Sequence, residues 1–323
     1  MPFMSAQRWF SLGKETDRGV GVDPTLWLPI APNPTLEPKV TWLKDEGLRG
    51  SPDKQYGAVP GFRHDEFDFK GNVFADTFPA LLQGILGSSD TVAGTGPYTH
   101  SIGLLNDPST GSQPPSYTLY DVDNLVQGSD SAKMVTDGQL SQLDIEFTAD
   151  GAMTYSAKYL GDAFSYVVPP DITFSDEIFI PAWSAALTIG TVDLSVVMKG
   201  SISIKRNVQP IYTLGTQSPY RLFADAIDVQ TKFTFVSEAN DVFFGDALVS
   251  DPVALTFTFT DPVSGHSVEF TMSSVQLMNP KTDSSKNWIE VSTDGVALAN
   301  TTDAILGYAP IQTVTTNAQS TAY

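Results

Sequence analysis

Alternation of apolar and polar side chains along most of the chain predicts β-strands. In residues 64–73, Phe67 and Phe69 fall on one side of an extended chain and acidic side chains fall on the other. Residues 140–148 repeat this pattern, and a turn joins them to a strand at 153–160, as in a β-hairpin. Further strands are predicted at 98–105, 116–122, 185–189, 194–205, 226–236, 253–260 and 267–277, and residues 290–295 form another element bounded by turns. We therefore expect a mainly β fold, arranged as a β-sandwich or a β-barrel.

One segment follows a helical period instead. Between residues 78 and 86, apolar side chains recur at every third or fourth position, so they form one stripe along an α-helix. Pro79 is tolerated in the first turn of a helix, and Gly87 can end a helix in the left-handed conformation. We expect a single α-helix that flanks the sheet and covers its apolar side.

Three segments lack a clear period. Residues 1–38 contain repeated prolines, which withhold backbone donors and favour extended geometry, so we expect an extended N-terminal arm. Residues 45–62 are expected to form a long polar loop, and residues 313–323 a flexible C-terminal tail. The arm is more aromatic than a disordered segment usually is. Its apolar residues are therefore candidates for packing against a neighbouring subunit, with docking on their own subunit as the alternative: Trp9, Phe10, Trp27 and Leu28.

Between the arm and the tail, residues 39–312 are expected to form the β domain. No repeat of fixed period divides this range. The part after about residue 240 either forms a separate outer domain or completes the same one, and we expect one domain with elaborations.

The charge of the chain excludes several classes of function. The 323 residues include 37 acidic and 18 basic side chains, for a formal net charge of −19. Such a chain lacks the basic footprint of proteins that wrap or read DNA. No apolar stretch approaches the roughly 20 residues that span a bilayer, and the first residues lack the layout of a secretory signal, so we expect no membrane insertion. The absence of cysteine excludes disulfide scaffolds, thiolate zinc sites and cysteine nucleophiles.

Motifs of catalysis are absent from the sequence. The histidines His64, His100 and His266 lack the spacing of metal-ligating pairs, and neither a nucleophile elbow nor a phosphate-binding glycine loop occurs. Asp121 begins a stretch that hints at a calcium loop, but the glycine and glutamate that an EF-hand requires are missing. We therefore expect no enzyme, with no catalytic residue, no metal site and no cofactor.

The order of several short motifs carries a family resemblance. In chain order they are FPALLQGILG at 78–87, PYTHSIGL at 97–104, PSYTLY at 115–120, QLSQLDIEF at 139–147, GAMTYS at 151–156, YLG at 159–161 and GSISIKRN at 200–207. This ordered set resembles the tail tube proteins, or major tail proteins, of bacteriophages with long non-contractile tails. The resemblance runs from about residue 64 to 240 and weakens towards residue 300, and no single motif is diagnostic.

The resemblance implies a β-sandwich or β-barrel subunit, flanked by one helix, that assembles with itself into hexameric rings. The rings would stack into a tail tube around the tape measure protein, and double-stranded genome DNA would later pass through without sequence-specific binding. It further implies contacts with the tail terminator and distal tail proteins, location in the virion tail and assembly in the host cytoplasm.

Two sets of charged residues take candidate roles in such a tube. An acidic wall repels DNA phosphates weakly and lets a duplex slide, whereas a basic wall would bind and hold the duplex. The lumen candidates, with outward solvent-facing positions as the alternative, are Glu66, Asp68, Asp144 and Glu146. Lys205 and Arg206 are candidates for pairing with acids of a neighbouring ring, with a solvated turn as the alternative.

Two other functions remain open from the sequence. A virion decoration protein, or a receptor- or carbohydrate-binding β-sandwich, has the same composition. A monomeric or trimeric state with an exposed aromatic patch favours that reading. A β-rich carbohydrate-active enzyme requires two carboxylates across a cleft, at least one of them with a raised pKa.

Overall fold

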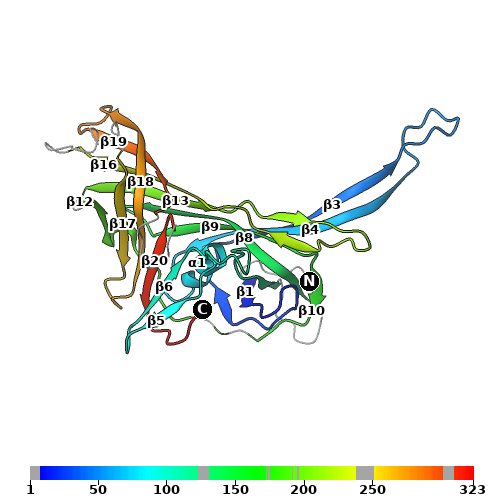
Figure 1. Ribbon diagram of the computed structural model, residues 1–323, viewed down its shortest axis with the longest axis horizontal. Helices are drawn as coiled ribbons and strands as arrows, with labels where there is room; N and C mark the ends of the chain where they lie inside the picture. Colours follow the sequence, from blue (N-terminus) through cyan, green and yellow to red (C-terminus); the bar gives the residue numbers. More distant parts are fainter. Residues whose placement is uncertain are drawn as a thin grey trace.

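The computed structural model describes residues 8–122, 131–171, 173, 175–190, 192–194, 196–237, 251–300 and 309–323. Within these ranges the chain is mainly β, with one α-helix and one short 3-10 helix (Figure 1), so the predicted fold class is confirmed. The elements are β1 (Trp9–Lys14), β2 (Leu26–Leu28), β3 (Thr35–Asp45), β4 (Gly57–Asn72), α1 (Phe78–Leu86), β5 (Thr91–Ala93), β6 (Tyr98–Gly103), β7 (Tyr117–Val122), β8 (Ala132–Thr148), β9 (Thr154–Gly161), β10 (Ser165–Val167), η2 (Ala182–Ser184), β11 (Ala185–Ile189), β12 (Val192–Leu194), β13 (Val197–Lys205), β14 (Gln209–Ile211), β15 (Arg221–Phe223), β16 (Asp228–Val236), β17 (Val253–Thr260), β18 (Ser267–Asp283), β19 (Glu290–Ala297) and β20 (Gln312–Asn317).

The longest ladder of antiparallel strands, called the long sheet below, runs in the order β3, β4, β9, β8, β13, β16, β19 and β18. In its central strands every second residue is buried, for example Phe67 and Phe69 in β4 and Leu143 and Ile145 in β8. Most of the residues between them are exposed or half-buried. The long sheet therefore has one apolar and one polar face, as the alternation predicted.

Two further ladders share strands with the long sheet. The second sheet has the order β12, β11, β17, β18, β20, β6 and β5, and its strand β18 continues into the long sheet. The short sheet has the order β2, β1, β7, β8 and β10. Strand β8 pairs with β7 and β10 before residue 139 and with β9 and β13 after it. Figure 1 shows α1, β1 and β6 on the same side of β8 and β9.

Helix α1 lies between these layers. It spans Phe78–Leu86 as predicted, and Gly87 ends it with a φ of 89°. All 9 residues of the helix are buried. The single predicted stripe understates this burial because α1 packs against both β8 and β6. Gly84 permits the close approach, since a Cβ atom there would lie 3.3 Å from the side chains of both Tyr117 and Tyr159.

Both ends of the chain belong to the fold, which corrects the predicted arm and tail. Strand β1 pairs with β2 and, along its whole length, with β7. Strand β20 is inserted between β18 and β6, and the Tyr323 hydroxyl donates a hydrogen bond to the carbonyl oxygen of Asp76. The sequence pattern did not predict β1 and β2 because prolines lie around them. It did not predict β20 because that strand is rich in threonine. Residues 1–7 of the expected arm lie outside the described residues.

The strands after residue 250 pair with earlier strands and belong to the same sheets. Strand β17 pairs with β11, β19 pairs with β16, and β20 pairs with β6. In the described chain this region therefore completes the sheets formed by the earlier strands. Residues 238–250 and 301–308 lie outside the described ranges.

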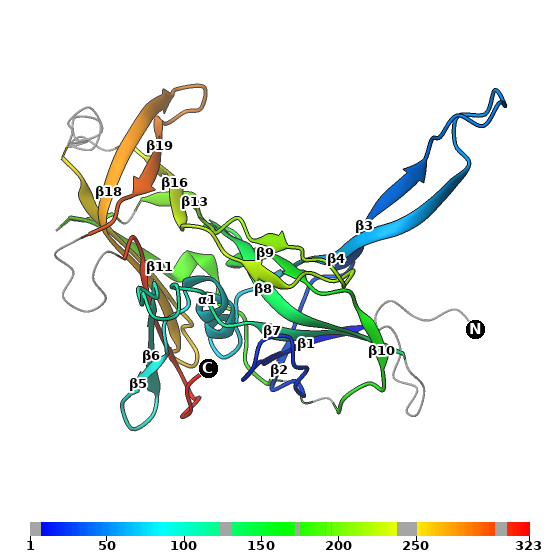
Figure 2. The ribbon, with the colours of Figure 1, turned by 45° about the vertical axis from the view of Figure 1, so that its right-hand side comes forward.

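A long β-hairpin stands where the sequence predicted a polar loop. Strand β3 extends to Asp45, and β4 begins at Gly57, opposite it. Residues 40–63, called the projecting hairpin below, point away from the rest of the molecule in both Figure 1 and Figure 2. The pattern did not reveal these strands because the hairpin carries apolar side chains on both faces, which removes the period of two.

Buried carboxylates connect the N-terminal strands to β8 and the end of β9. Glu15 accepts hydrogen bonds from the hydroxyl groups of Ser116 and Thr118, at 2.7 and 3.0 Å, and from the backbone N–H of Asp137 at 2.9 Å. Burial raises the pKa of Asp137 to about 6. Burial, with the charges of Asp137 and Glu15, raises the pKa of Asp162 to about 6 as well.

Replacing Asp162 with asparagine is expected to stabilise the protein at neutral pH. The folded state holds the Asp162 proton up to about pH 6, whereas an ordinary aspartate releases it near 3.8, so the wild type loses stability as the pH rises between these values. Asp162→Asn removes this loss and should raise the melting temperature at about pH 7 but not at about pH 3. Thermal unfolding across this range tests the prediction, with Asp150→Asn in an exposed turn as the control. Equal melting temperatures for Asp162→Asn and wild type at neutral pH contradict it.

Candidate functional site

The four acids proposed for a lumen lie on the polar face of the long sheet. Asp68 of β4 is directly opposite Lys158 of β9, and Asp144 of β8 is directly opposite Ser156 of β9. Because residues two apart in a strand point to the same side, Lys158 and Ser156 share a face with both acids. By the same rule, the full set on this face is Glu66, Asp68, Asp144 and Glu146.

The same face carries lysines as well as acids. Over β4, β9, β8, β13, β16 and the part of β3 up to Lys39, the charged residues whose register places them on this face are all exposed or half-buried. We call them the charged face, and they are Glu37, Lys39, Glu66, Asp68, Lys70, Asp144, Glu146, Lys158, Lys199, Lys205, Asp228 and Lys232. The acidic wall expected from the sequence is therefore interleaved with lysines.

Two lysines on this face stabilise the ionised form of the Glu66 carboxylate. The Lys158 ammonium lies 2.8 Å from a carboxylate oxygen of Glu66, and the Lys39 ammonium lies 3.8 Å from the same oxygen. Burial raises the pKa of Glu66, but the hydrogen bond and charge of Lys158, together with the charge of Lys39, outweigh it, so that pKa lies below its ordinary value. Burial raises the pKa of Asp68, and the charge of Lys158 opposes the rise.

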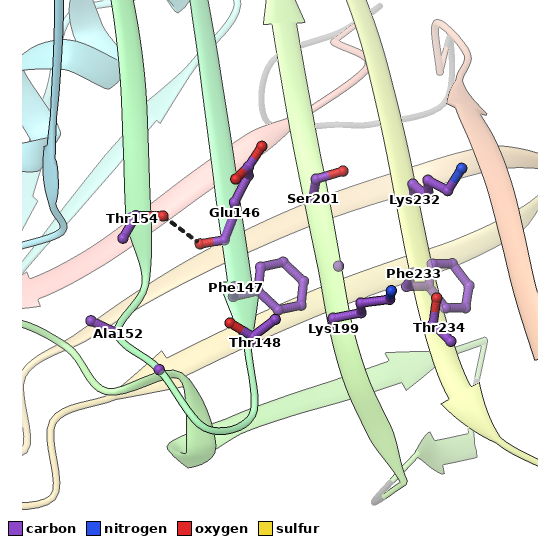
Figure 3. Close-up of a pocket in the computed structure, with 12 residues that line it drawn as sticks. Glu146, Phe147, Thr148, Ala152, Thr154, Lys199, Ser201, Lys232, Phe233 and Thr234 are labelled. Carbon is purple, nitrogen blue, oxygen red and sulfur yellow. Dashed lines mark hydrogen bonds between the residues drawn. The ribbon is translucent and has the colours of Figure 1, made fainter. Parts of the chain in front are cut away.

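The centre of the charged face is a broad hydrophilic surface. Glu146, Ser201 and Lys232 form one row across β8, β13 and β16 (Figure 3). A depression of about 480 Å³ beside this row is lined also by Phe147 and Phe233. It offers one carboxylate, not the pair that a glycosidase requires. Among the described residues, no group of three or more His, Cys, Asp or Glu is arranged to hold a metal ion.

The projecting hairpin exposes large apolar side chains on both of its faces. Trp42 lies opposite Pro60, and Leu43 lies opposite Val59. Neighbouring residues in a strand point to opposite faces, so Trp42 lies on one face and Leu43 with Val59 on the other. Their exposed fractions are 57% for Trp42, 57% for Leu43 and 59% for Val59. Large apolar side chains left this exposed on a projecting element indicate a site of protein–protein contact.

The long sheet is open at both ends of its ladder. Within the described residues β3 pairs only with β4, so the other edge of β3 has no strand partner. At the far end, the part of β18 after Val275 pairs with β19 on one side and with no described strand on the other. Unpaired edges present backbone N–H and C=O groups that accept a strand of another chain.

A family model described as phage tail tube protein matches residues 6–315, a range that includes the projecting hairpin and both open edges. The chain belongs to the phage tail tube family. No curated protein matches the chain. The resemblance carried by the ordered motifs is thus confirmed, and the chain is a structural component of a phage tail, located in the virion, that builds a tube with other tail proteins. No helix in the part of the chain that the structure describes is long and apolar enough to cross a membrane.

The apolar residues of the N-terminal segment are mostly covered by their own chain. Phe10 is 1% exposed, and its ring stacks on Phe67 with centroids 4.7 Å apart. Trp9 and Leu28 are also buried, whereas Trp27 is half-buried. For Trp9, Phe10 and Leu28 the structure shows docking on the same subunit, which corrects the expectation that they contact a neighbour.

Lys205 and Arg206, proposed together for contacts between rings, differ in position. Arg206 is buried, and its guanidinium donates to the carbonyl oxygens of Ile85 at 3.3 Å, Ser112 at 3.0 Å and Asp225 at 3.2 Å. Because Ile85 lies in the last turn of α1, Arg206 satisfies a carbonyl group at the helix end, which corrects its proposed role. Lys205 is half-buried and belongs to the charged face.

The hint of a calcium loop at Asp121 has a different explanation. The Arg8 guanidinium makes two hydrogen bonds to the Asp121 carboxylate, at 2.7 and 2.6 Å, and this carboxylate is buried. Asp121 therefore anchors the N-terminal segment. Asp123 and Asn124 of the same stretch lie outside the described residues.

Sequence reasoning missed the apolar residues of the projecting hairpin. The available signal was the presence of Trp42 and Leu43 immediately before the predicted polar loop, and of Val59 inside it. It also missed Lys199 and Lys232, although both occupy polar positions of predicted strands, and it assigned Lys205 to contacts between rings without placing it on this face. Their neighbours across the sheet follow only from the strand register.

Replacing Arg206 with alanine is expected to destabilise the subunit by about 2 kcal/mol or more, because three carbonyl groups lose a buried charged donor. The adjacent Lys205→Ala, at a half-buried surface position, should change the free energy of unfolding by only about 0.5 kcal/mol. Urea unfolding of both variants measures the difference. A similar small loss in both variants contradicts the structural role of Arg206.

Proposed function

We propose that this tail tube protein assembles into hexameric rings that stack into the tube, with the charged face of the long sheet lining the lumen. The tape measure protein occupies the lumen first, and double-stranded genome DNA passes through it later. The tail terminator and distal tail proteins bind the ends of the tube, and assembly takes place in the host cytoplasm.

The observation that carries this proposal is the open long sheet with its two different faces. Helix α1 and the other sheets cover the apolar face, whereas the charged face remains in contact with solvent. Pairing of β3 of one copy with the open edge of β18 of the next joins the sheets of a ring into one barrel. Closure removes the unpaired edges and turns every charged face to the same side of the wall.

The projecting hairpin supports the stacking of rings. It extends beyond the body of the subunit (Figure 2), and its exposed side chains Trp42, Leu43 and Val59 make it apolar on both faces. One neighbouring surface covers only one face, so full burial requires two. Burial of Trp42, Leu43 and Val59 between copies contributes roughly 2 kcal/mol for each side chain, which is enough to drive association.

Passage of DNA without sequence recognition fits the chemistry of the charged face. Lysines, carboxylates and the hydroxyl groups of residues such as Ser201 lie along a smooth sheet. Reading a base sequence requires an element that enters a groove of the duplex, and a sheet face that surrounds the duplex has no such element.

A second candidate is a virion decoration protein or a receptor- or carbohydrate-binding module. Exposed aromatic side chains away from the projecting hairpin favour it, among them Trp183 at 65% and Tyr220 at 73% exposure. Such a module functions as a compact monomer or trimer and has no need of an open sheet edge.

Negative-stain electron microscopy of the purified recombinant protein, with light scattering on the same sample, separates the two candidates. Rings or open-ended tubes with a central hole are the expected result. A stable compact trimer overturns the proposed assembly and favours the decoration or receptor-binding module.

Removing the apolar side chains from one face of the projecting hairpin is expected to prevent tube formation. The double variant Leu43→Ser with Val59→Ser should remain folded, because both side chains are more than half exposed in the single chain. Val263→Ser, at an exposed turn between β17 and β18, is the matched control and should still form tubes. Electron microscopy scores assembly, and circular dichroism confirms folding. Tubes from the double variant in the same yield as the control contradict the role of the hairpin.

A further inference from the structure

Where β9 ends, the long sheet continues into the projecting hairpin as two strands. Strand β9 pairs with β4 from Asp65 to Asn72. From Gly57 to His64, the only strand of the described chain that pairs with β4 is β3. A two-stranded hairpin is marginally stable by itself and twists more strongly than a wide sheet. Its direction therefore depends on support from another part of the subunit.

A β-bulge lies at the base of the projecting hairpin. Val40 of β3 lies opposite Arg63 of β4. Trp42, two residues further along β3, lies opposite Pro60, which is three residues from Arg63. Strand β4 thus has one residue more than β3 over this step, and such an extra residue bends a strand and increases its local twist. The bulge is therefore the point at which the hairpin changes direction relative to the sheet.

A loop from a distant part of the chain supports the bulge. Residues 212–217, called the brace below, belong to the connection between β14 and β15, which is yellow-green and lies at the base of the projecting hairpin in Figures 1 and 2. The Arg63 N–H donates a hydrogen bond of 2.9 Å to the carbonyl oxygen of Gln217. The side-chain amide of Gln217 donates a hydrogen bond of 3.1 Å to the carbonyl oxygen of Pro60. Gln217 thus connects the two ends of the bulge.

Tyr212 adds an aromatic contact to the same site. Its ring stacks on the ring of Phe62, with centroids 4.3 Å apart and an angle of 21° between the planes. Its hydroxyl lies 2.7 Å from Nδ1 of His64, within hydrogen-bond distance. A stacked aromatic pair stabilises a contact beyond the area that it buries. The brace therefore contacts β4 through side chains as well as through the backbone.

The brace is itself fixed to the body of the subunit. Leu222 of β15 is fully buried in an apolar cluster with Leu160 of β9 and two further residues, Val208 and Ala224. The Leu222 N–H also donates a hydrogen bond of 3.3 Å to the carboxylate of Asp137 in β8. Because these contacts hold β15 on β8 and β9, the brace does not follow a movement of the projecting hairpin. Such a movement breaks the contacts between the two.

We propose that the brace holds the projecting hairpin in one direction before subunits meet, which makes Tyr212 and Gln217 positioning residues for the stacking of rings. This inference rests on the proposed function, which assigns ring stacking to the hairpin. A hairpin that swings freely loses this freedom when it docks, and the loss weakens association. A hairpin that is already held in its docking direction avoids that loss. The same contacts resist tilting of one ring against the next.

The first test measures the direction of the hairpin in unassembled subunits. The chain contains no cysteine, so spin labels attach only at introduced ones. One label is placed at Ser51→Cys in the turn of the projecting hairpin and the other at Ser165→Cys in β10, and both positions are exposed. Double electron–electron resonance, below the protein concentration at which tubes form, gives the distribution of distances between the labels.

Two variants weaken the brace from opposite sides. One carries Tyr212→Ala with Gln217→Ala, and the other carries Phe62→Ala, which leaves β14 and β15 unchanged. The matched control is Leu214→Ala, which removes a side chain of the brace that is 99% exposed. Tyr212→Phe keeps the stacked ring and loses only the hydroxyl.

We expect a narrow distance distribution for the wild type, for Leu214→Ala and for Tyr212→Phe. The two weakened variants should give a distribution at least about twofold broader, because a two-stranded hairpin without support samples several directions. Equal widths in the wild type and in both weakened variants overturn the inference, whatever the protein assembles into.

The second test scores tubes of the unlabelled proteins by negative-stain electron microscopy. The variant with Tyr212→Ala and Gln217→Ala should form tubes only at about tenfold higher protein concentration, and these tubes should be more strongly curved. Tyr212→Phe should assemble like the wild type. If the hairpin is mobile in the first variant but its tubes form at the wild-type concentration and are equally straight, the role of the brace in stacking is overturned and the tube function stands. A wild-type protein that forms a stable trimer and no tubes overturns the proposed function, and the label distances still decide whether the brace holds the hairpin.

Discussion

The structure depends on covering one face of a long antiparallel sheet while the other face stays in water. Strict alternation in β4, β9, β8, β13 and β16 places an aromatic or branched side chain on one face at nearly every second position. That surface is too large to be left exposed. Helix α1, the second sheet and the short sheet supply the cover, and the fully buried helix shows how closely the layers meet. The hydrophobic burial that stabilises the fold thus also determines which face remains polar.

The sequence predicted the fold class, the helix and most of the central strands, because these elements follow regular periods. The strands it missed share a physical reason: they lack the alternation of apolar and polar side chains that marks a half-buried strand. In β1, five successive residues from Trp9 are buried, because the strand is enclosed on both faces. In β20 the buried positions are Thr313, Thr315 and Asn317, so polar side chains occupy the place of apolar ones.

The candidate surfaces were predicted only in part, for reasons of register. That Glu66 and Asp144 occupy polar positions follows from their own strands. That they share one face with Lys158 and Lys205 follows from pairings between strands far apart in the sequence, which no local pattern contains. The assignments of Phe10 and Arg206 failed for a related reason, since an aromatic or charged residue in an irregular segment gives no indication of which side of the subunit covers it.

Strand β4 gives the subunit a mechanical property. It runs without a break from the projecting hairpin into the centre of the long sheet, where Asp65 to Asn72 pair with β9. A pull on the hairpin along this strand therefore loads the backbone hydrogen bonds to β9 together and in shear, rather than opening them one at a time. A tail that bends while its tip is anchored passes tension from subunit to subunit, and a continuous strand distributes that tension over the long sheet, which in the proposed tube forms the wall of the channel.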